Sequence, residues 1–395
     1  MYFAQIFHKI LCKFSCKILQ KSFENTSATT ANFAVQYCVI TAKFGGTAVT
    51  PENLHFVKNI LSPNHKVVVV SAIGKRHFGD TKTTDLLHQY FAFGNEKFWQ
   101  KVCQNYQDLV EQNGIDLDVD KYLFIAKKQA KISLAHCLSL GEELSARCIA
   151  KYLGGQFLDA QNLVIFKGNR LDLPSTISAI KAQIGGNNLV VVGGFYGGNK
   201  QGRQVFPRGG GDISGAIFAR ATGSSEYQNW TDVDGVCTVD PTLASGGFVY
   251  PNLAYNQMHT MANCGANVLH KTAVKLCQSV ALPICVGNFF SGKIGTIVGN
   301  VASKRLLSVT EKKCKNQVVS TVIHKFPMEQ IAKVVAIFCK QFAKLQRGFL
   351  PDLARQNAIH NVEIGKNSVV FRSTCSLLPL LWHCFQPLAE QAFLP

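Results

Sequence analysis

The chain has 395 residues, of which 47% are hydrophobic and 16% charged, and its formal net charge is +17. This composition supports a large buried core and excludes a disordered chain. No run of eighteen apolar residues occurs, so no membrane span is predicted. The fourteen cysteines form no C-x-x-C pair, which argues against a disulfide framework or a zinc site and favours reduced thiols in the cytoplasm.

The positive charge is concentrated in the two ends of the chain. Residues 1–40 carry four lysines against one glutamate, and residues 291–395 carry fourteen Lys and Arg against five Asp and Glu. Such basic surfaces occur in nucleic-acid binders, and that alternative rests here on charge alone. Since no zinc-finger spacing and no aromatic RNA-binding run is present, we expect no nucleic-acid partner. A basic cleft also suits anionic substrates such as nucleotides.

Residues 1–36 are expected to form an extension ahead of the fold. Lysines recur there at every fourth position beside an apolar flank, which predicts one amphipathic helix. The lysines also interrupt the apolar run, and this disfavours a secretory signal. A polar segment at 25–32 is interpreted as a linker.

Predicted strands alternate with predicted helices from about residue 37. Uninterrupted valine runs at 66–72 and 188–192 indicate strands buried on both faces, as in a parallel sheet. Other strands are predicted at 35–40, ending at 230–232, and at 282–286, and helices at 51–61, 84–93, 138–153 and 212–222. This alternation predicts an α/β fold with a largely parallel sheet.

The pattern changes near residue 300. A strand at 317–324, a helix at 328–342 and a strand at 367–373 predict a small α/β unit. No element is assigned over 376–395.

Three glycine-rich or polar segments follow predicted strands, at 43–47, 193–198 and 208–212. Ligands of parallel sheets bind beyond the carboxyl ends of the strands, so these segments are expected to share a site. Glycine turns and helix N-termini present backbone N–H groups to phosphates, and cations stabilise the charge of a transferred phosphoryl group. Taken singly, each motif also has a plain structural interpretation, either a tight strand–helix turn or a helix cap.

Seven short blocks, in order over residues 37–300, resemble the aspartate kinases of the amino acid kinase family. They are K-F-G-G-T-A-V at 43–49, V-S-A at 70–72 with T-D-L at 84–86, G-E-E-L-S-A at 141–146, G-F-Y-G at 194–197, R-G-G-G-D at 208–212, T-D-V-D-G-V at 231–236 with D-P at 240–241, and G-A-N-V-L-H at 265–270. Each block is weak alone, but the ordered set is specific. The resemblance implies a three-layer α/β/α sandwich as the catalytic domain over 37–300.

The resemblance implies transfer of the γ-phosphoryl group of ATP, with Mg²⁺, to the β-carboxylate of L-aspartate. The product is 4-phospho-L-aspartate, the first step towards lysine, threonine and methionine, and a homodimer is expected. The implied catalytic residues are Lys43 and Asp212. The implied L-aspartate ligands are Ser71, Thr84, Glu142, Phe195 and Arg208, with Glu142 on the ammonium and Arg208 on the α-carboxylate. The implied nucleotide ligands are Lys43, Gly45, Gly46, Gly209, Gly210, Thr231, Asp232 and Asp240. No metal site made of protein ligands is expected.

Four positions depart from the family pattern. Gly211 replaces a serine, Cys237 a tyrosine, Thr242 an arginine and Asn267 a lysine. Loss of the lysine removes a charge-assisted contact of about 1–3 kcal/mol. These departures leave open an alternative function, that of a catalytically weakened homologue that binds nucleotide or amino acid as a regulatory protein.

The C-terminal part also departs from the family pattern. Aspartate kinases usually carry two ACT modules after the catalytic domain, whereas the segment 306–375 suits one. Residues 301–395 are therefore expected to be a truncated ACT-like region for regulation or dimerisation.

Overall fold

The structure is a computed structural model that describes residues 39–186, 188–303, 306–314, 317–324, 326, 328–348, 359–364, 368–373 and 377–393. The extension expected over residues 1–36 lies outside the described residues. Within the described ranges, no helix has both the length and the apolar character needed to cross a membrane.

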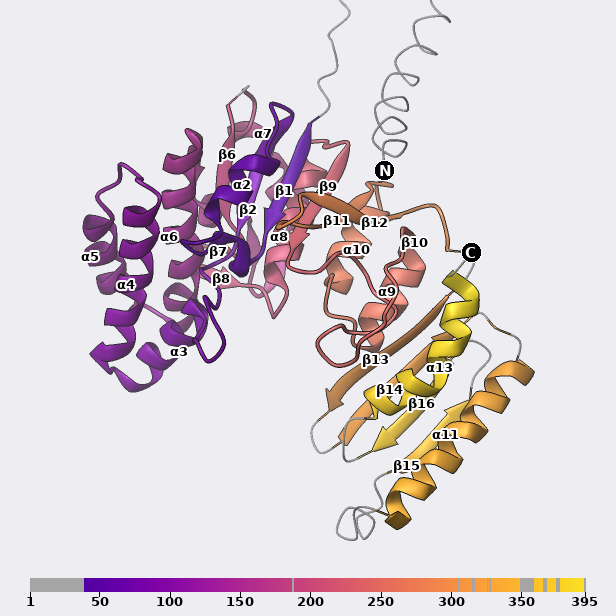
Figure 1. Ribbon diagram of the computed structural model, residues 1–395. Coiled ribbons are helices and arrows are strands. Elements are labelled where there is room, and N and C mark those ends of the chain that lie inside the picture. The colour runs from indigo at the N-terminus through magenta and orange to yellow at the C-terminus, as the bar shows by residue number, and fades with distance from the viewer. Residues whose placement is uncertain are drawn as a thin grey trace, which may run out of the picture. The chain divides into compact units, whose positions relative to one another are not determined.

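An eight-stranded sheet forms the centre of the α/β part of the chain, which comprises the described residues from 39 to 299 (Figure 1). Its strands are, in spatial order, β10 (Asn252–Ala254), β12 (Lys293–Gly299), β11 (Ile284–Asn288), β9 (Glu226–Thr231), β1 (Ile40–Phe44), β2 (His65–Val70), β6 (Val190–Gly193) and β3 (Gln156–Leu158). All neighbouring pairs are parallel except β11 with β12. The prediction of a largely parallel sheet is confirmed.

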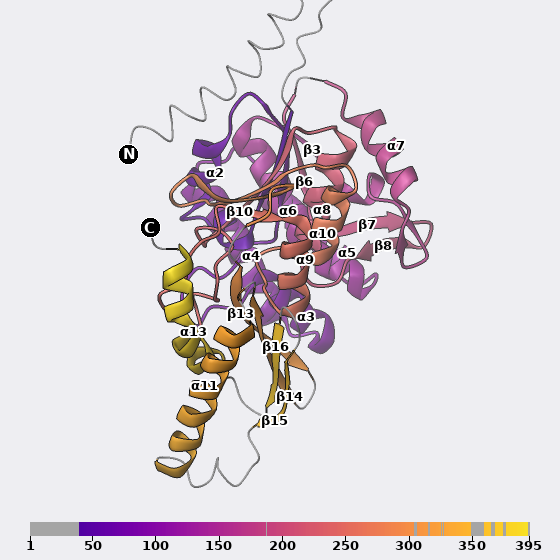
Figure 2. The same cartoon turned by 90° about the vertical axis from the view of Figure 1, so that its right-hand side faces the viewer.

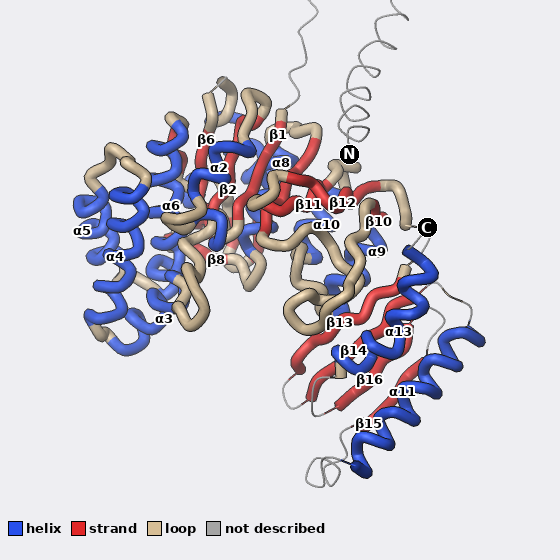
Figure 3. The backbone as a smooth tube through the Cα atoms, viewed as in Figure 1, coloured by secondary structure: helices blue, strands red, loops and turns tan. Residues whose placement is uncertain are grey.

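Helices cover both faces of the sheet, because its central strands are apolar on both faces. In β2, Val68 and Val70 pack into one hydrophobic cluster, and Val67 and Val69 pack into another on the opposite face. The first cluster is completed by α2 (Leu54–Ile60), α3 (Thr83–Phe93), α4 (Glu96–Gln112), α5 (Val119–Gln129) and α6 (Leu134–Leu153), and the second by α7 (Leu173–Gln183) and α8 (Gly210–Ala221). This is the expected three-layer α/β/α arrangement, and α3, α4 and α5 pack with α6 as a helical group (Figure 3).

A third cluster lies around α9 (Tyr255–Cys264) and α10 (Lys271–Gln278) beside β10, β11 and β12. Two small hairpins lie outside the main sheet: β4 (Phe166–Lys167) with β5 (Arg170–Leu171), and β7 (Tyr196–Asn199) with β8 (Gly202–Val205). A short 3-10 helix, Gly46–Val49, follows β1, and a second one spans Ala160–Asn162.

The predicted elements are present with shifted ends. The strand predicted at 35–40 lies mostly outside the described residues, and the first described strand is Ile40–Phe44, which contains Lys43. The helix α6 begins at Leu134, four residues before the predicted start, because Ser133 accepts a hydrogen bond from the backbone N–H of His136 and caps the helix.

Among its described residues, the C-terminal region consists of a four-stranded antiparallel sheet and two helices (Figure 2). Its strand order is β13 (Leu307–Cys314), β14 (Gln317–His324), β16 (Ser368–Ser373), β15 (Ile359–Ile364), and its helices are α11 (Met328–Gly348) and α13 (Leu378–Phe393). This arrangement is consistent with the expected ACT-like region. No element is predicted over 376–395, where the structure has α13 with Pro387 inside it.

Several contacts join the C-terminal sheet to the α/β part of the chain. The backbone N–H of Val309 donates to the carbonyl of Thr238 at 2.8 Å, and that of Leu307 donates to the Tyr250 hydroxyl at 3.0 Å. The indole N–H of Trp382, on α13, donates to the carbonyl of Ser245 at 2.8 Å.

Candidate active site

A cavity of about 830 Å³ lies where β1, β2 and β6 end. Its walls include most of the residues that the sequence singled out, namely Lys43, Gly46, Ser71, Thr84, Glu142, Phe195, Arg208, Gly209, Gly210 and Asp212. The crossover connections of a parallel sheet carry these distant segments to one edge. Gly45, Thr231, Asp232 and Asp240 are not among the lining residues.

Lys43 and Asp212 form an ion pair in the cavity wall, with 2.9 Å between Nζ and Oδ1. Both side chains are largely buried, at 12% and 11% exposure. The backbone N–H of His270 donates to Asp212 Oδ2 at 3.1 Å, and the amide of Asn229 donates to Oδ1 at 3.4 Å. Asp212 is therefore fixed from two sides and holds the Lys43 ammonium at the cavity.

The glycine run at the start of α8 allows close packing around the cavity. Gly209 has φ +83, and a Cβ there would lie 2.7 Å from the His270 ring. A Cβ on Gly210 would lie 2.8 Å from the Phe195 ring. At Gly211 the nearest atoms would be Lys43 Cε and Ser71 Oγ, both at 3.4 Å. Side chains are thus excluded at the first two glycines, whereas the third has room for a small one.

Gly46 packs against Gly74, a residue that the sequence analysis did not single out. The N–H of Gly74 donates to the carbonyl of Gly46 at 2.9 Å. A Cβ on Gly74 would lie 2.6 Å from the Gly46 carbonyl carbon, and one on Gly46 would lie 2.8 Å from the Ala72 carbonyl oxygen. Both glycines are needed for the loops after β1 and β2 to touch. The N–H of Gly45 donates to the Trp230 carbonyl at 3.2 Å.

Phe195 lines the cavity with a backbone conformation rare for a non-glycine residue, φ +74. Its N–H donates to the hydroxyl of Ser214 at 3.0 Å, and its carbonyl accepts from Phe206 N–H at 2.8 Å. Such a conformation costs about 1–3 kcal/mol and persists when neighbouring contacts enforce it. Ser214 and Phe206 supply those contacts.

Glu142 is the buried acid of the cavity, with 4% of the residue exposed. Burial raises the pKa of its carboxyl to about 8, against the lowering effect of the backbone N–H groups of Glu142 and Ala72. Within the described part of the chain, Oε2 has no hydrogen-bond partner. An unpartnered buried carboxylate oxygen in a cavity wall is a site for a cationic ligand group.

The next residue, Glu143, joins α6 to neighbouring segments through ion pairs. Its carboxylate pairs with Arg203 of β8 at 2.5 Å and with Arg147 at 2.8 Å. Arg203 also reaches Asp159 at 3.1 Å, and that carboxylate accepts from the hydroxyl of Tyr196 at 2.9 Å. This network ties the β7–β8 hairpin, which follows Phe195, to the helix that carries Glu142. Its members come from three segments, namely α6, the residue after β3 and the β7–β8 hairpin, and nothing in the sequence links them.

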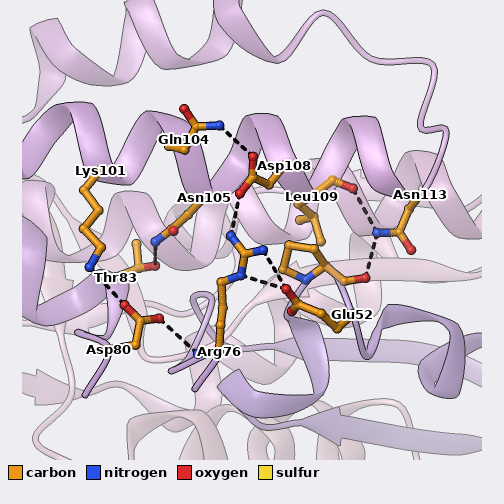
Figure 4. A network of polar contacts seen from close by, with 11 residues as sticks. Glu52, Arg76, Asp80, Thr83, Lys101, Gln104, Asn105, Asp108, Leu109 and Asn113 are labelled. Carbon is orange, nitrogen blue, oxygen red and sulfur yellow. Dashed lines mark hydrogen bonds and ion pairs between the residues drawn. The ribbon is translucent and has the colours of Figure 1, made fainter. Parts of the chain in front are cut away.

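A second network holds the loop between β2 and α3 (Figure 4). The loop supplies Ser71 and Gly74 to the cavity and leads into α3, which supplies Thr84. Arg76 bridges Glu52, at 2.6 Å, and Asp108 of α4, at 2.5 Å.

Asp80 holds the same loop through a second set of contacts (Figure 4). Its carboxylate accepts from the N–H groups of Arg76, at 3.0 Å, and Thr81, at 2.8 Å, and pairs with Lys101 at 3.0 Å. Burial raises the pKa of Asp80, but these partners outweigh burial and lower it to about 2.

The predicted nucleotide residues outside the cavity have local partners. Thr231 Oγ1 donates to Asp232 Oδ1 at 3.1 Å. Asp240 Oδ1 accepts from the N–H of Thr242 at 2.9 Å and from its hydroxyl at 2.6 Å. Their part in nucleotide binding stays a prediction.

The cavity carries an excess of positive charge. Four of its basic lining residues belong to no salt bridge among the described residues, namely Lys82, Arg208, Lys271 and Lys312. The acidic residues of its lining are Asp85, Asp212, which is paired with Lys43, and the buried Glu142. The balance favours anionic ligands.

Comparison with known proteins shows which proteins this chain is similar to. Aspartokinase 3 of Bacillus subtilis is 29% identical over 274 residues, which are 62% of this chain and 60% of that protein. The aspartokinase of Chlamydia pneumoniae is 29% identical over 277 residues, covering 65% and 61%. The chain thus spans about three fifths of the length of these curated relatives.

Solved structures agree in fold. The aspartate kinase of Clostridium acetobutylicum has a TM-score of 0.64 and 25% identity, and the match covers 89% of this chain and 82% of that one. E. coli aspartokinase III, solved with aspartate and ADP, has a TM-score of 0.63 and 23% identity, and the match covers 89% of this chain and 83% of that one. At this identity the similarity establishes a shared fold only. The sequence model of the amino acid kinase family matches residues 39–288, and the chain belongs to that family.

Proposed function

We propose that this chain is an aspartate kinase that transfers the γ-phosphoryl group of ATP to the β-carboxylate of L-aspartate, as a step of amino-acid biosynthesis. The observation that carries the proposal is the cavity itself, in which a buried acid, Glu142, faces the same space as Lys43 and Arg208. The aspartokinase names of the relatives support it further.

The cavity's charges match the groups of L-aspartate. Glu142 takes the α-ammonium through its unpartnered oxygen, and the exposed guanidinium of Arg208 takes the α-carboxylate in a bidentate contact. Ser71 and Thr84 contribute hydroxyls, and Phe195 closes the wall. The β-carboxylate is left free as the nucleophile.

The reaction needs positioning and charge stabilisation rather than proton removal. A carboxylate of pKa about 3.9 is already ionised at neutral pH. One of its oxygens forms a bond to the γ-phosphorus while the bond from that phosphorus to the bridging oxygen of ADP breaks. Lys43, held by Asp212 at 2.9 Å, stabilises the charge on the transferring group. The N–H groups at the start of α8, by Gly209 and Gly210, face the phosphates.

Mg²⁺ enters with the nucleotide in this proposal. Among the described residues there is no group of three or more His, Cys, Asp or Glu placed to hold a metal ion. Mg²⁺ is commonly held through substrate phosphates and one or two carboxylates, which fits its arrival as MgATP.

The test is turnover of MgATP with L-aspartate, with the acyl phosphate trapped as a hydroxamate, beside a Lys43→Ala variant. We expect aspartate-dependent hydroxamate that falls at least a hundredfold in the variant, a loss typical of removing one electrostatic stabiliser. Light scattering of the same sample tests the proposed homodimer.

Nucleotide binding without hydroxamate would instead establish the second candidate, a weakened homologue with a regulatory role. The substitutions at Gly211, Thr242 and Asn267 favour that candidate. In addition, Asp240 already binds Thr242, where the family carries an arginine.

A further inference from the structure

A lysine from the C-terminal sheet reaches the catalytic cavity. Lys312 belongs to β13, the first strand of that sheet, and it lines the cavity together with Asn267, His270 and Lys271. Every other lining residue belongs to the catalytic domain. The cavity wall is therefore shared between the two parts of the chain.

Close main-chain packing fixes β13 at this place. Gly265, with φ +119, lies directly against the strand, since a Cβ there would be 2.2 Å from the carbonyl oxygen of Glu311. The hydrogen bond from Val309 to Thr238 ties the same strand to the catalytic domain three residues earlier. Lys312 is thus held by backbone contacts on rigid elements, not by a free loop.

The charge of Lys312 is available to a ligand. The residue is exposed and forms no salt bridge among the described residues. It faces the cavity near Asn267, the position where the family resemblance leads one to expect a lysine. A cation is missing from the loop at 265–270, and a cation from β13 lies in the wall of the same cavity.

We propose that Lys312 binds an anionic oxygen of the substrates in the catalytic cavity and supplies the positive charge that Asn267 lacks. This inference deepens the proposed function and rests on it. The ligand is a phosphate oxygen of the nucleotide or a carboxylate oxygen of the amino acid, which share the same chemistry. In either case the C-terminal sheet is part of the substrate site, so movement of β13 alters substrate affinity directly.

The test compares Lys312→Ala and Lys312→Arg with Lys313→Ala in the full chain. Lys313 is the next residue of β13, also exposed, and does not line the cavity, because successive side chains of a strand point to opposite faces. Titration calorimetry with MgADP measures nucleotide binding, and the hydroxamate assay gives the KM for each substrate.

If Lys312 binds phosphate, Lys312→Ala raises the dissociation constant of MgADP and the KM for ATP about tenfold, a loss in the range of charge-assisted contacts. If it binds a carboxylate, the KM for L-aspartate rises by that factor and MgADP binding stays. Lys312→Arg retains most of the affinity, and Lys313→Ala stays within about twofold of the parent chain. Equal constants for Lys312→Ala and the parent would overturn the inference.

Failure of the inference and failure of the proposed function give different results. A parent chain that makes no hydroxamate, but whose MgADP binding weakens in Lys312→Ala, sinks the kinase proposal and keeps Lys312 as an anion ligand. A parent that turns over normally and is indifferent to Lys312→Ala keeps the kinase and removes Lys312. A parent that neither binds MgADP nor turns over contradicts both.

Discussion

At the scale of single residues, Glu142 makes the affinity for a cationic substrate group depend on pH. Its pKa of about 8 leaves roughly one carboxyl in ten ionised at pH 7. An ammonium binds the ionised form, so binding at neutral pH must release a proton. The fraction of Glu142 that is ionised grows with pH. Because the folded-state pKa is raised to about 8, ionisation is complete only above pH 8. We expect the KM for L-aspartate to fall about tenfold per unit between pH 6 and 7.5 and to level off above 8.

Glu142→Gln is the control for this profile, because it keeps the shape and removes the titration. The variant should bind L-aspartate more weakly at pH 8.5, with a KM that is flat over the same range. Burial lowers the pKa of His270, another titratable group of the cavity lining. A slope that persists in Glu142→Gln would assign it to another group.

Gly211 tests whether a departure from the family pattern weakens the site. The serine Cβ fits at 3.4 Å from Lys43 Cε and Ser71 Oγ, in ordinary contact. Its hydroxyl would lie beside the Lys43 ammonium, where it can donate to an anionic substrate. A neutral hydrogen bond contributes about 0.5–1.5 kcal/mol, so we expect Gly211→Ser to raise kcat/KM about twofold to tenfold.

The neighbouring glycine provides the matched control for that substitution. In Gly210→Ser the same Cβ would lie 2.7 Å from the Cβ of Phe206 and 2.8 Å from the Phe195 ring. This variant should lose activity and melting temperature together. Loss of activity in Gly211→Ser at an unchanged melting temperature would contradict the expected gain.

The sequence predicted several of the charged residues that line the cavity and that we propose carry the chemistry. Lys43, Glu142 and Arg208 are recognisable because their charges stand in short blocks. Gly74 and the φ of Phe195 were missed because their roles depend on contacts with Gly46 and Ser214, which are distant in the chain. A one-dimensional pattern does not record which loops touch.

At the scale of elements, the loop after β2 is held in place by Arg76. Replacing Arg76 by Met leaves Glu52 and Asp108 facing one another without their shared cation. Unpairing charges that are partly buried costs about 1–3 kcal/mol. We expect a lower melting temperature and a KM for L-aspartate about threefold to tenfold higher, because this loop begins at Ser71 and leads into α3, which carries Thr84. Steady-state kinetics and a thermal melt measure both effects.

Lys127→Ala is the matched control for Arg76→Met. Lys127 pairs with Glu96 at 2.7 Å, but both side chains are exposed, at 41% and 53%. Exposed pairs contribute about 0–1 kcal/mol, so neither KM nor melting temperature should change noticeably. An unchanged KM in Arg76→Met would show that the loop keeps its shape without the bridge.

The predictability of elements follows the same physics. The valine runs of β2 and β6 identify them because strands buried on both faces are apolar throughout. The helix α13 was not predicted because Pro387 removes a backbone donor and disfavours a helix interior. Its apolar face, with Trp382 and Phe385 buried, compensates through packing that only the folded chain reveals.

At the scale of the whole molecule, described residues on the two sides of the boundary expected near residue 300 share hydrophobic cores. Leu306 and Ile323 pack in the cluster around α9 and α10. In the other direction, Val239 of the catalytic domain packs among the residues of the C-terminal sheet. Cores shared in this way couple the stability of the two parts.

We therefore expect catalytic domain and C-terminal sheet to unfold together. Trp382 is 2% exposed and donates to Ser245 across the boundary, and replacing a buried tryptophan by alanine costs about 3–5 kcal/mol. In Trp382→Ala the midpoint by calorimetry and the midpoint for loss of MgADP binding should fall together, on the order of 5–10 °C. His383→Ala, an exposed neighbour on the same helix, should leave both unchanged. Two separate thermal transitions, of which Trp382→Ala shifts only the one with the smaller unfolding enthalpy, would mean that the two parts fold independently. In that case the C-terminal sheet, which contains β13, would unfold without the rest of the chain. Its unfolding would remove Lys312 from the cavity in spite of the backbone contacts of β13.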